Sequence, residues 1–442
     1  MELSGFPTAE LEFNRDAGVV GTVDAVLALA ADPATTDLLV LSHGWNNDMR
    51  EARDLYANLA RSLRTVLDSG AVPSLAGRQI AIAGVLWPSK KFADSELIPG
   101  GAAAAGSPID AADILEQLAA LRDVFADDPA AQRALDDAAA LLPVLADKAT
   151  ARAEFADHLR SLLTPAAAES EDASTDLFKV SGDTLMTRLA RPASLAPPAG
   201  AGAGGAAALG SAPADHRGGA GGAAGLGGLI GGVWGAARNL TNFVTYYAMK
   251  TRAGTVGERG LAPVLARVQA ARPDLRIHLA GHSFGGRLVS AAANGLGAHG
   301  TPLASLALLQ AAFSHYGFAE NWDPGQNGYF RHVVTDKLVT GPTLITHTGN
   351  DKAVGIAYAI ASRVAGQTAA ALGDANDKYG GLGRNGAQKT PEAVAGTLLP
   401  VGGAYAWQAG RLHNLRADQF IGGHSDITGQ QVAYALLSAI AG

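Results

Sequence analysis

The chain of 442 residues contains no cysteine. Disulfide bonds, thiolate nucleophiles and cysteine-ligated zinc or iron–sulfur clusters are therefore excluded. The sequence also lacks a His-Glu-x-x-His pair and a Walker A phosphate loop. Two Gly-x-Gly-x-x-Gly matches, at 200–205 and 381–386, do not follow a predicted strand, as a dinucleotide site requires. We predict no cofactor and no required metal ion.

Positive charge is in the minority, since 34 lysine and arginine residues face 41 acidic ones, for a formal net charge of −7. The chain shows no basic stripe that would neutralise nucleic-acid phosphates, so we do not expect a nucleic acid as a partner. The opening residues MELSGFPTAELEFNRD lack the basic and apolar regions of a secretory signal. We therefore expect a cytoplasmic protein, with signal-less export left open.

Long hydrophobic runs are scarce, and the uncharged run that could span a bilayer, residues 218–237, is half glycine. Glycine disfavours a helix by roughly 1 kcal/mol per residue relative to alanine, so we do not expect a membrane span there. The surrounding stretch 192–235 consists mainly of Gly, Ala and Pro, a composition that favours mobility. We expect a flexible lid leading into an aromatic helix around Phe243, Tyr246 and Tyr247, with membrane-surface contact as the second interpretation.

Strand and helix signals alternate near both ends of the chain, which predicts an α/β fold with a mostly parallel central sheet flanked by helices. The apolar runs 38–41, 80–87 and 275–280 are typical of buried strands. Residues 48–67 show helical spacing, with Asp48 as the N-cap. We assign the core to residues 1–90 and 255–442, and a cap insertion to residues 91–254, with alanine-rich helices at 109–125, 130–145 and 151–163.

A serine stands at the junction between a predicted strand and a predicted helix. The stretch 281–285 has the pattern G-x-S-x-G and consists of Gly281, His282, Ser283, Phe284 and Gly285. A sharp strand-to-helix turn exposes the serine hydroxyl, and glycine two residues before and after it relieves the crowding. The helix that follows directs its N–H groups and a partial positive charge at the serine. We predict that Ser283 is a nucleophile.

The strand, the G-x-S-x-G turn and the helix resemble the alpha/beta-hydrolase superfamily, most closely its lipase-like and esterase-like bacterial members. The resemblance covers residues 1–90 and 255–442, and leaves out the insertion. It implies an alpha/beta-hydrolase fold and a catalytic triad in the chain order serine, acid, histidine. It also implies cleavage of a carboxylic ester, small or lipid-like, through an acyl-serine intermediate.

The chain order of that family places the acid after the second strand beyond the serine, and the histidine just before the last helix. Asp351 follows the predicted strand 343–346, with Asp323, Asp336 and Asp377 as competing carboxylates. His424 precedes a final helix with an apolar face, and His413 is the nearest rival. In these roles His424 is the general base, and Asp351 fixes its tautomer and stabilises the imidazolium.

The resemblance further implies an oxyanion hole built from two backbone N–H groups. One comes from Phe284, and the other from the loop after strand 38–41, for which Trp45 is the candidate donor. Gly44 would permit close backbone approach there, and His43 would brace the loop. Four residues after the strand 303–309 either line the substrate pocket or cover the sheet edge: Phe313, His315, Tyr316 and Phe318.

Two other classes of function remain open. An acyltransferase or a peptidase would use the same serine, acid and histidine with a different acceptor or leaving group. A binding module could carry the fold with an idle site, although an intact set of the three residues argues against this.

Overall fold

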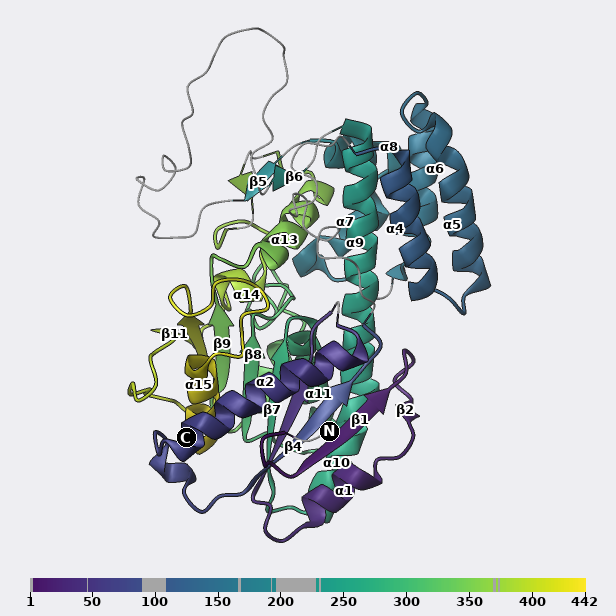
Figure 1. Cartoon of the computed structure of the whole chain (residues 1–442). Coiled ribbons are helices and arrows are strands. Elements are labelled where there is room, and N and C mark those ends of the chain that lie inside the picture. The colour runs from purple at the N-terminus through teal and green to yellow at the C-terminus, as the bar shows by residue number, and fades with distance from the viewer. Residues whose placement is uncertain are drawn as a thin grey trace, which may run out of the picture.

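The computed structural model describes residues 3–45, 47–89, 109–165, 168–191, 193–195, 228–229, 232–368, 371–372 and 374–442. Its centre is a nine-stranded sheet in the order β11-β12-β9-β8-β7-β3-β4-β1-β2, in which only β1 and β2 pair antiparallel (Figure 1). The mostly parallel sheet is thereby confirmed. The strands are β1 (Thr8–Phe13), β2 (Val19–Val20), β3 (Asp37–Ser42), β4 (Ile80–Leu86), β7 (Arg276–His282), β8 (Ser305–Leu309), β9 (Thr343–His347), β11 (Ala393–Thr397) and β12 (Leu412–Arg416).

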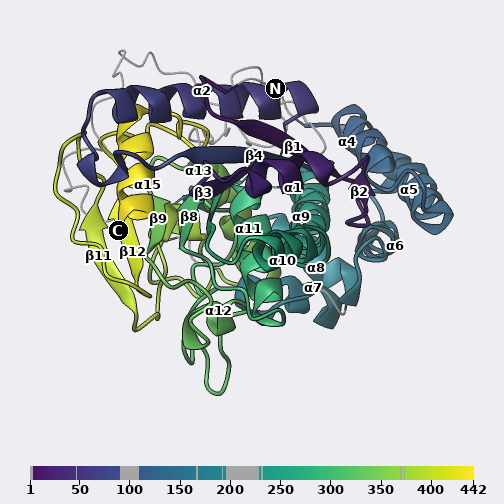
Figure 2. The ribbon, with the colours of Figure 1, turned by 90° about the horizontal axis from the view of Figure 1, so that it is seen from below.

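The central strands are apolar because helices cover both faces of the sheet. Every residue of β3 and β4 is buried, as their unbroken apolar runs predict. On one face α2 (Met49–Asp68) and α15 (Gln430–Ala441) pack on Leu39 and Ile82 (Figure 2). On the other face α1 (Asp24–Ala31), α10 (Ala262–Ala271) and α11 (Phe284–Gly297) pack on Leu38 and Val40. The prediction of flanking helices is confirmed.

Helix α2 begins where the sequence predicts. The Asp48 side chain accepts hydrogen bonds from the backbone N–H groups of Arg50 and Glu51, and the Glu51 side chain accepts one from the Asp48 N–H. This reciprocal capping box satisfies N–H groups that have no partner inside the helix. The capping box therefore fixes the point at which the loop after β3 ends and α2 begins.

The segment between β4 and β7 is mainly helical and packs beside the sheet (Figure 1). The three expected alanine-rich helices are present, with ends shifted by a few residues. The longest helix, α9, runs from this layer down to α11 and continues through a π-helical turn (Val256–Leu261) into α10. The helices are α4 (Ala111–Val124), α5 (Pro129–Leu141), α6 (Ala149–Arg160), α7 (Ser174–Lys179), α8 (Gly182–Leu189) and α9 (Gly232–Thr255).

The described residues of the glycine-rich stretch 192–235 have regular secondary structure, although its composition favours mobility. Short strands β5 (Ala193–Leu195) and β6 (Gly228–Leu229) join β10 (Ala371–Leu372) in a small sheet. Helix α9 already begins at Gly232, because Val233 and Trp234 pack against the core and offset the poor helix propensity of glycine. The rest of the expected lid, residues 192, 196–227 and 230–231, including the match at 200–205, lies outside the described residues.

The remaining α-helices are α12 (Arg331–Thr335), α13 (Lys352–Val364) and α14 (Leu382–Asn385), and short 3-10 helices lie at Pro73–Leu75, Leu142–Val144 and Ser170–Asp172. Helix α14 carries the second glycine match, 381–386, and a loop rather than a strand precedes it, as expected. Within the ranges that the structure describes, no helix is long and apolar enough to cross a bilayer.

Candidate active site

Ser283 occupies the sharp turn between β7 and α11. Its backbone dihedrals are φ 56° and ψ −122°, a strained conformation that costs about 1–3 kcal/mol for a residue with a side chain. Hydrogen bonds hold it there, because the Ser283 N–H donates to the Leu309 carbonyl at 3.1 Å and its carbonyl accepts from Ala312 N at 3.0 Å. The turn presents the side chain at the carboxyl end of the sheet.

Three glycines permit the close packing around this turn. A Cβ atom on Gly281 would lie 2.2 Å from the Gly285 carbonyl oxygen, and one on Gly285 would lie 2.2 Å from the Ser42 carbonyl oxygen. A Cβ atom on Gly44 would lie 2.6 Å from the Ser283 Cβ. Because these contacts are shorter than 3.0 Å, a larger residue at any of the three positions would force its neighbours to shift, and the loop after β3 lies directly against the serine.

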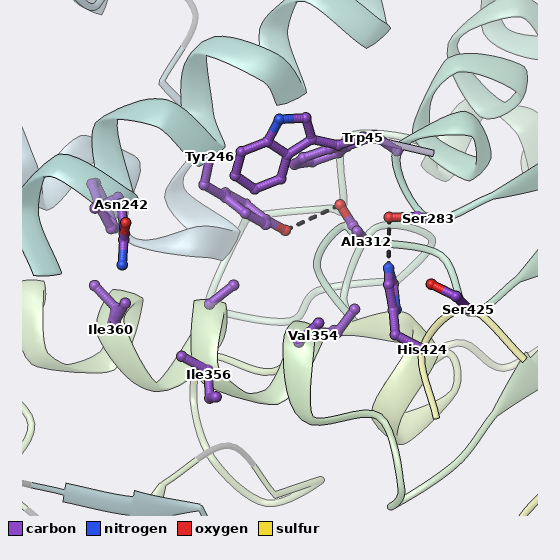
Figure 3. Close-up of a pocket in the computed structure, with 14 residues that line it drawn as sticks. Trp45, Asn242, Tyr246, Ser283, Ala312, Val354, Ile356, Ile360, His424 and Ser425 are labelled. Carbon is purple, nitrogen blue, oxygen red and sulfur yellow. Dashed lines mark hydrogen bonds between the residues drawn. The ribbon is translucent and has the colours of Figure 1, made fainter. Parts of the chain in front are cut away.

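The structure brings together the three residues predicted as a triad, from the carboxyl ends of β7, β9 and β12. His424 Nε2 lies 2.8 Å from Ser283 Oγ, and His424 Nδ1 lies 2.8 Å from Asp351 Oδ2 (Figure 3). The carboxylate is fully buried, whereas the imidazole is 21% exposed. Because a carboxylate only accepts hydrogen bonds, His424 carries its proton on Nδ1 and leaves Nε2 to accept the serine proton.

Asp351 is held from several sides. One oxygen, Oδ1, caps α13 by accepting from the Val354 N–H at 3.0 Å. The other accepts a long hydrogen bond from Gln310 Nε2 at 3.3 Å, in addition to that from His424. Gln310 follows β8 with φ 46° and is fully buried. Sequence reasoning missed this positioning residue, because nothing in the local pattern points to it.

The titration of the histidines follows from burial and charge. Burial acts to lower the pKa of His424, but the charge of Asp351 and its hydrogen bond outweigh it and raise the pKa above the ordinary value. Burial lowers the pKa of His282 to about 3, so this ring is neutral, and its Nε2 donates to the His424 carbonyl at 2.9 Å. His282 therefore positions the loop that carries the general-base candidate.

The loop of His43, Gly44 and Trp45 is rigidly placed. Burial lowers the pKa of His43 to about 4, and its Nδ1–H donates to the Gly44 carbonyl at 2.9 Å. The ring also stacks on Trp87, with centroids 5.5 Å apart. The arrangement fits the expected bracing role. The rings of Trp45 and Phe284 lie 5.8 Å apart beside the serine. The Phe284 N–H belongs to the first turn of α11, where backbone N–H groups have no acceptor inside the helix.

A cavity of about 290 Å³ opens at Ser283 and runs between α9 and α13. Among the described residues that line it, none is Asp, Glu, Lys or Arg. Sequence reasoning placed the aromatic part of α9 in the cap insertion, after the lid, and did not assign α13, so it missed most of the cavity wall. The lining residues are Trp45, Asn242, Phe243, Tyr246, Ser283, Phe284, Ala312, Ala353, Val354, Ile356, Ala357, Ile360, His424 and Ser425.

The residues that follow β8, Phe313, His315, Tyr316 and Phe318, are not among the described residues that line this cavity, so the structure does not support the interpretation of them as its lining. Each of these side chains is at most 5% exposed. Phe313 and Phe318 pack with Phe330, and Tyr316 stacks on Trp322. Position in sequence correctly indicated the carboxyl edge of the sheet, but it could not show that these rings face the interior.

The competing carboxylates and histidine take no part in the site. Asp323 pairs with Lys378 at the surface, Asp336 with His332, and Asp377 accepts from the backbone of Asp374. His413 lies within β12 and accepts a hydrogen bond from the Gln408 N–H.

A second chain of serine, histidine and aspartate occurs at the opposite end of the sheet. His278 Nε2 donates to Asp37 Oδ1 at 3.0 Å, and its Nδ1 lies 2.7 Å from Ser305 Oγ. Burial acts to raise the pKa of Asp37, but hydrogen bonds from His278, Arg78 and Arg276 hold it well below its ordinary value. Ser305, His278 and Asp37 are each at most 1% exposed. Hydrogen-bond geometry alone therefore does not make a site, and Ser305 offers a matched control for Ser283.

A buried charge cluster lies one helical turn beyond the serine. Arg287 of α11 donates to Glu169 Oε1 at 2.5 Å, and Lys250 of α9 donates to Glu169 Oε2 at 2.5 Å and also pairs with Asp172. Burial raises the pKa of the neighbouring Glu171 to about 8, and the charge of Glu169 adds to this effect. The cluster ties α9 and the turn Ser170–Asp172 to the helix that carries the serine.

The raised pKa of Glu171 predicts a pH-dependent stability. The folded state binds the Glu171 proton more tightly than the unfolded state does. The contribution of Glu171 to the free energy of unfolding is therefore complete below pH 4.5 and is lost as the pH rises through about 8. A Glu171→Gln variant keeps an acceptor for the Tyr329 N–H, which now donates at 2.8 Å, and carries no charge. We expect it to melt about 3 °C above the wild type at pH 9 and no higher at pH 5. Equal melting temperatures at pH 9 would refute the buried proton.

The contact at Gly44 predicts a loss of activity without loss of the fold. In Gly44→Ala the new methyl group must displace Ser283 or the loop, since its Cβ would lie 2.6 Å from the serine Cβ. If the protein cleaves esters as its sequence leads us to expect, kcat/KM for an ester substrate should fall by roughly 10²-fold, the effect of displacing a reacting group by about 1 Å. Gly429→Ala is the control, because its Cβ would meet only the end of the Gln431 side chain, at 3.5 Å. Equal kcat/KM values in the two variants would contradict the close approach.

Comparison of the chain with protein-family models, with curated proteins and with solved structures gives no significant match. The function is therefore inferred from the geometry of the site and from the resemblance of its motif.

Proposed function

We propose that the protein is a serine hydrolase with an alpha/beta-hydrolase fold, and that it cleaves carboxylic esters through an acyl-serine intermediate. One observation carries the proposal: the hydrogen-bonded chain Ser283–His424–Asp351 ends at a cavity, with the serine on a strained turn before a helix. The parallel sheet supports the fold, since the three side chains follow the carboxyl ends of separate strands, where ligands bind in such sheets.

The geometry supports a two-step mechanism. Ser283 Oγ attacks the ester carbonyl while His424 Nε2 takes its proton. The resulting oxyanion accepts hydrogen bonds from the N–H groups of Phe284 and Trp45, and it collapses as His424 returns the proton to the leaving alkoxide. Water then attacks the acyl-serine, His424 takes a proton from it, and the carboxylic acid leaves with Ser283 restored. Asp351 fixes the tautomer of His424 throughout and stabilises its imidazolium form.

The cavity favours an ester over a peptide as the substrate. Its walls are mainly aliphatic and aromatic side chains of α9 and α13. A peptide substrate needs partners for the N–H and carbonyl groups on both sides of the cleaved bond, because unpaired polar groups are costly to bury. Hydrocarbon chains make no such demand. The peptidase and acyltransferase alternatives share the acyl-serine, and initial rates on p-nitrophenyl esters and peptide anilides, with and without added alcohol, separate them.

A fluorophosphonate probe tests the proposal directly. The wild type and Ser305→Ala should each take up one probe molecule, and Ser283→Ala should take up none. Ser305 is the matched control because it also bonds a histidine that bonds an aspartate, but it is buried away from the cavity. Circular dichroism confirms that each variant is folded. Folded wild type that takes up no probe would favour a binding module with an idle site.

A further inference from the structure

The cavity at Ser283 is elongated, and the serine lies at one end of it. Figure 3 shows Ser283 and His424 at one end and Asn242 and Ile360 at the other, with Trp45 and Tyr246 between them. The leaving alcohol must lie on the His424 side, because that imidazole delivers its proton. The arm of the ester that runs away from His424 is therefore the acyl chain, and the cavity between α9 and α13 is its binding site.

The cavity limits the length of that chain. At about 290 Å³ the cavity lies at the small end of the range for ligand pockets, ~300–1,000 Å³. Along α13 the wall extends from Ala353 to Ile360, a rise of about 10 Å at 1.5 Å per residue. Both measures indicate a medium acyl chain, shorter than the chains of most membrane lipids.

The walls also limit the chemistry of the chain. Most of the lining between the two ends is apolar, with Val354, Ile356 and Ile360 on one side and Phe243 and the ring of Tyr246 on the other. The described lining offers no charged partner, so a carboxylate or an ammonium group on the chain would be buried unpaired. The chain is therefore uncharged.

Asn242 is the polar group at the far end. Its Nδ2 is buried and has no hydrogen-bond partner, an arrangement that proteins generally avoid. Tyr246, one turn further along α9, already donates its hydroxyl to the Ala312 carbonyl at 3.0 Å. Asn242 lines the cavity, and because the terminal torsion of asparagine is broad, rotation about it can direct the amide donor into the cavity. A ligand oxygen there would supply the missing partner.

We propose, on the basis of the proposed function, that the substrates are esters of uncharged medium-chain acids that carry an oxo or hydroxyl oxygen near the far end of the chain, which Asn242 recognises. The apolar wall binds the carbon chain and sets its length. The amide of Asn242 selects the oxygenated chain over the plain hydrocarbon one.

The test compares p-nitrophenyl esters of butanoate, octanoate, dodecanoate and 7-oxooctanoate. For the wild type we expect kcat/KM to be highest at eight carbons among the plain chains, and about tenfold higher again for the 7-oxo ester, as one hydrogen bond would give. Asn242→Leu should lose or reverse the preference for the oxo ester, and Asn242→Ala should lose it. The ratio of the two eight-carbon esters cancels any loss of folded protein.

Asn58→Leu is the matched control, because Asn58 lies on the exposed side of α2, outside the cavity lining, and its ratio should equal that of the wild type. A wild type that hydrolyses these esters without preferring the oxo chain, or an unchanged ratio in Asn242→Leu, overturns this inference and leaves the proposed function intact. Absence of both hydrolysis and fluorophosphonate labelling overturns the proposed function itself.

Discussion

Replacing Ser283 or His424 by alanine should lower kcat for p-nitrophenyl esters by roughly 10⁶-fold, and replacing both should lower it no further. In the proposed mechanism the two residues act on one proton, since the hydrogen bond of 2.8 Å joins Ser283 Oγ to His424 Nε2. Without either partner only the oxyanion donors and substrate binding remain. Initial rates of p-nitrophenol release measure the effect, with Ser305→Ala as the control of unchanged activity.

Neither substitution should unfold the protein. The Ser283 side chain bonds His424 at the edge of the cavity, and its strained backbone is held by main-chain hydrogen bonds that alanine retains. The His424 ring is partly exposed, so its removal leaves no sealed void in the core. Melting temperatures within about 2 °C of the wild type are expected. A variant that keeps more than a few per cent of the activity would contradict the role of its residue.

Asp351→Asn should lower kcat by about 10⁴-fold with the fold unchanged. The asparagine amide can donate to Nδ1 of His424, which moves the imidazole proton to Nε2, where it blocks acceptance of the serine proton. The cap of α13 survives, because asparagine is as good an N-cap as aspartate. The loss is therefore chemical rather than structural.

The same variant should also change the pH dependence of kcat/KM. The charge of Asp351 and its hydrogen bond raise the pKa of His424 against the effect of burial, so the wild-type rate falls on acidification from above pH 6.5. Loss of the negative charge lowers the pKa of His424, and the acidic limb of the profile should move to lower pH. A limb at the wild-type position in Asp351→Asn would show that this carboxylate does not face the base.

The parts that the sequence could predict depend on short-range patterns. The buried strand 38–41, the cap at Asp48 and the glycine-flanked turn at Ser283 follow from neighbouring residues and from the conformations those residues favour. Asp351 and His424 follow from the chain order of a resembling family rather than from the local pattern alone. The structure brings both within 2.8 Å of their expected partners.

The parts that the sequence could not predict depend on contacts between distant segments. Asn242 belongs to α9 and Ile360 to α13, and 96 residues lie between these two helices in the sequence. Only the packing of the two helices creates the cavity wall. An aromatic residue at Phe313 or Phe318 suits both a pocket lining and a cover over the sheet edge. Only the packing in the structure shows that both rings are buried. The start of α9 within glycine-rich sequence depends on packing of Trp234, which composition does not reveal.

The central claim is that Ser283 carries the acyl group during turnover. The most direct measurement mixes the protein with a p-nitrophenyl ester, stops the reaction with acid within milliseconds, and locates added mass by peptide mapping. We predict a burst of p-nitrophenol of up to one equivalent of protein, with the acyl mass on the peptide that contains Ser283 and on no other. An acyl group on a different side chain, or an undiminished burst in Ser283→Ala, would contradict it.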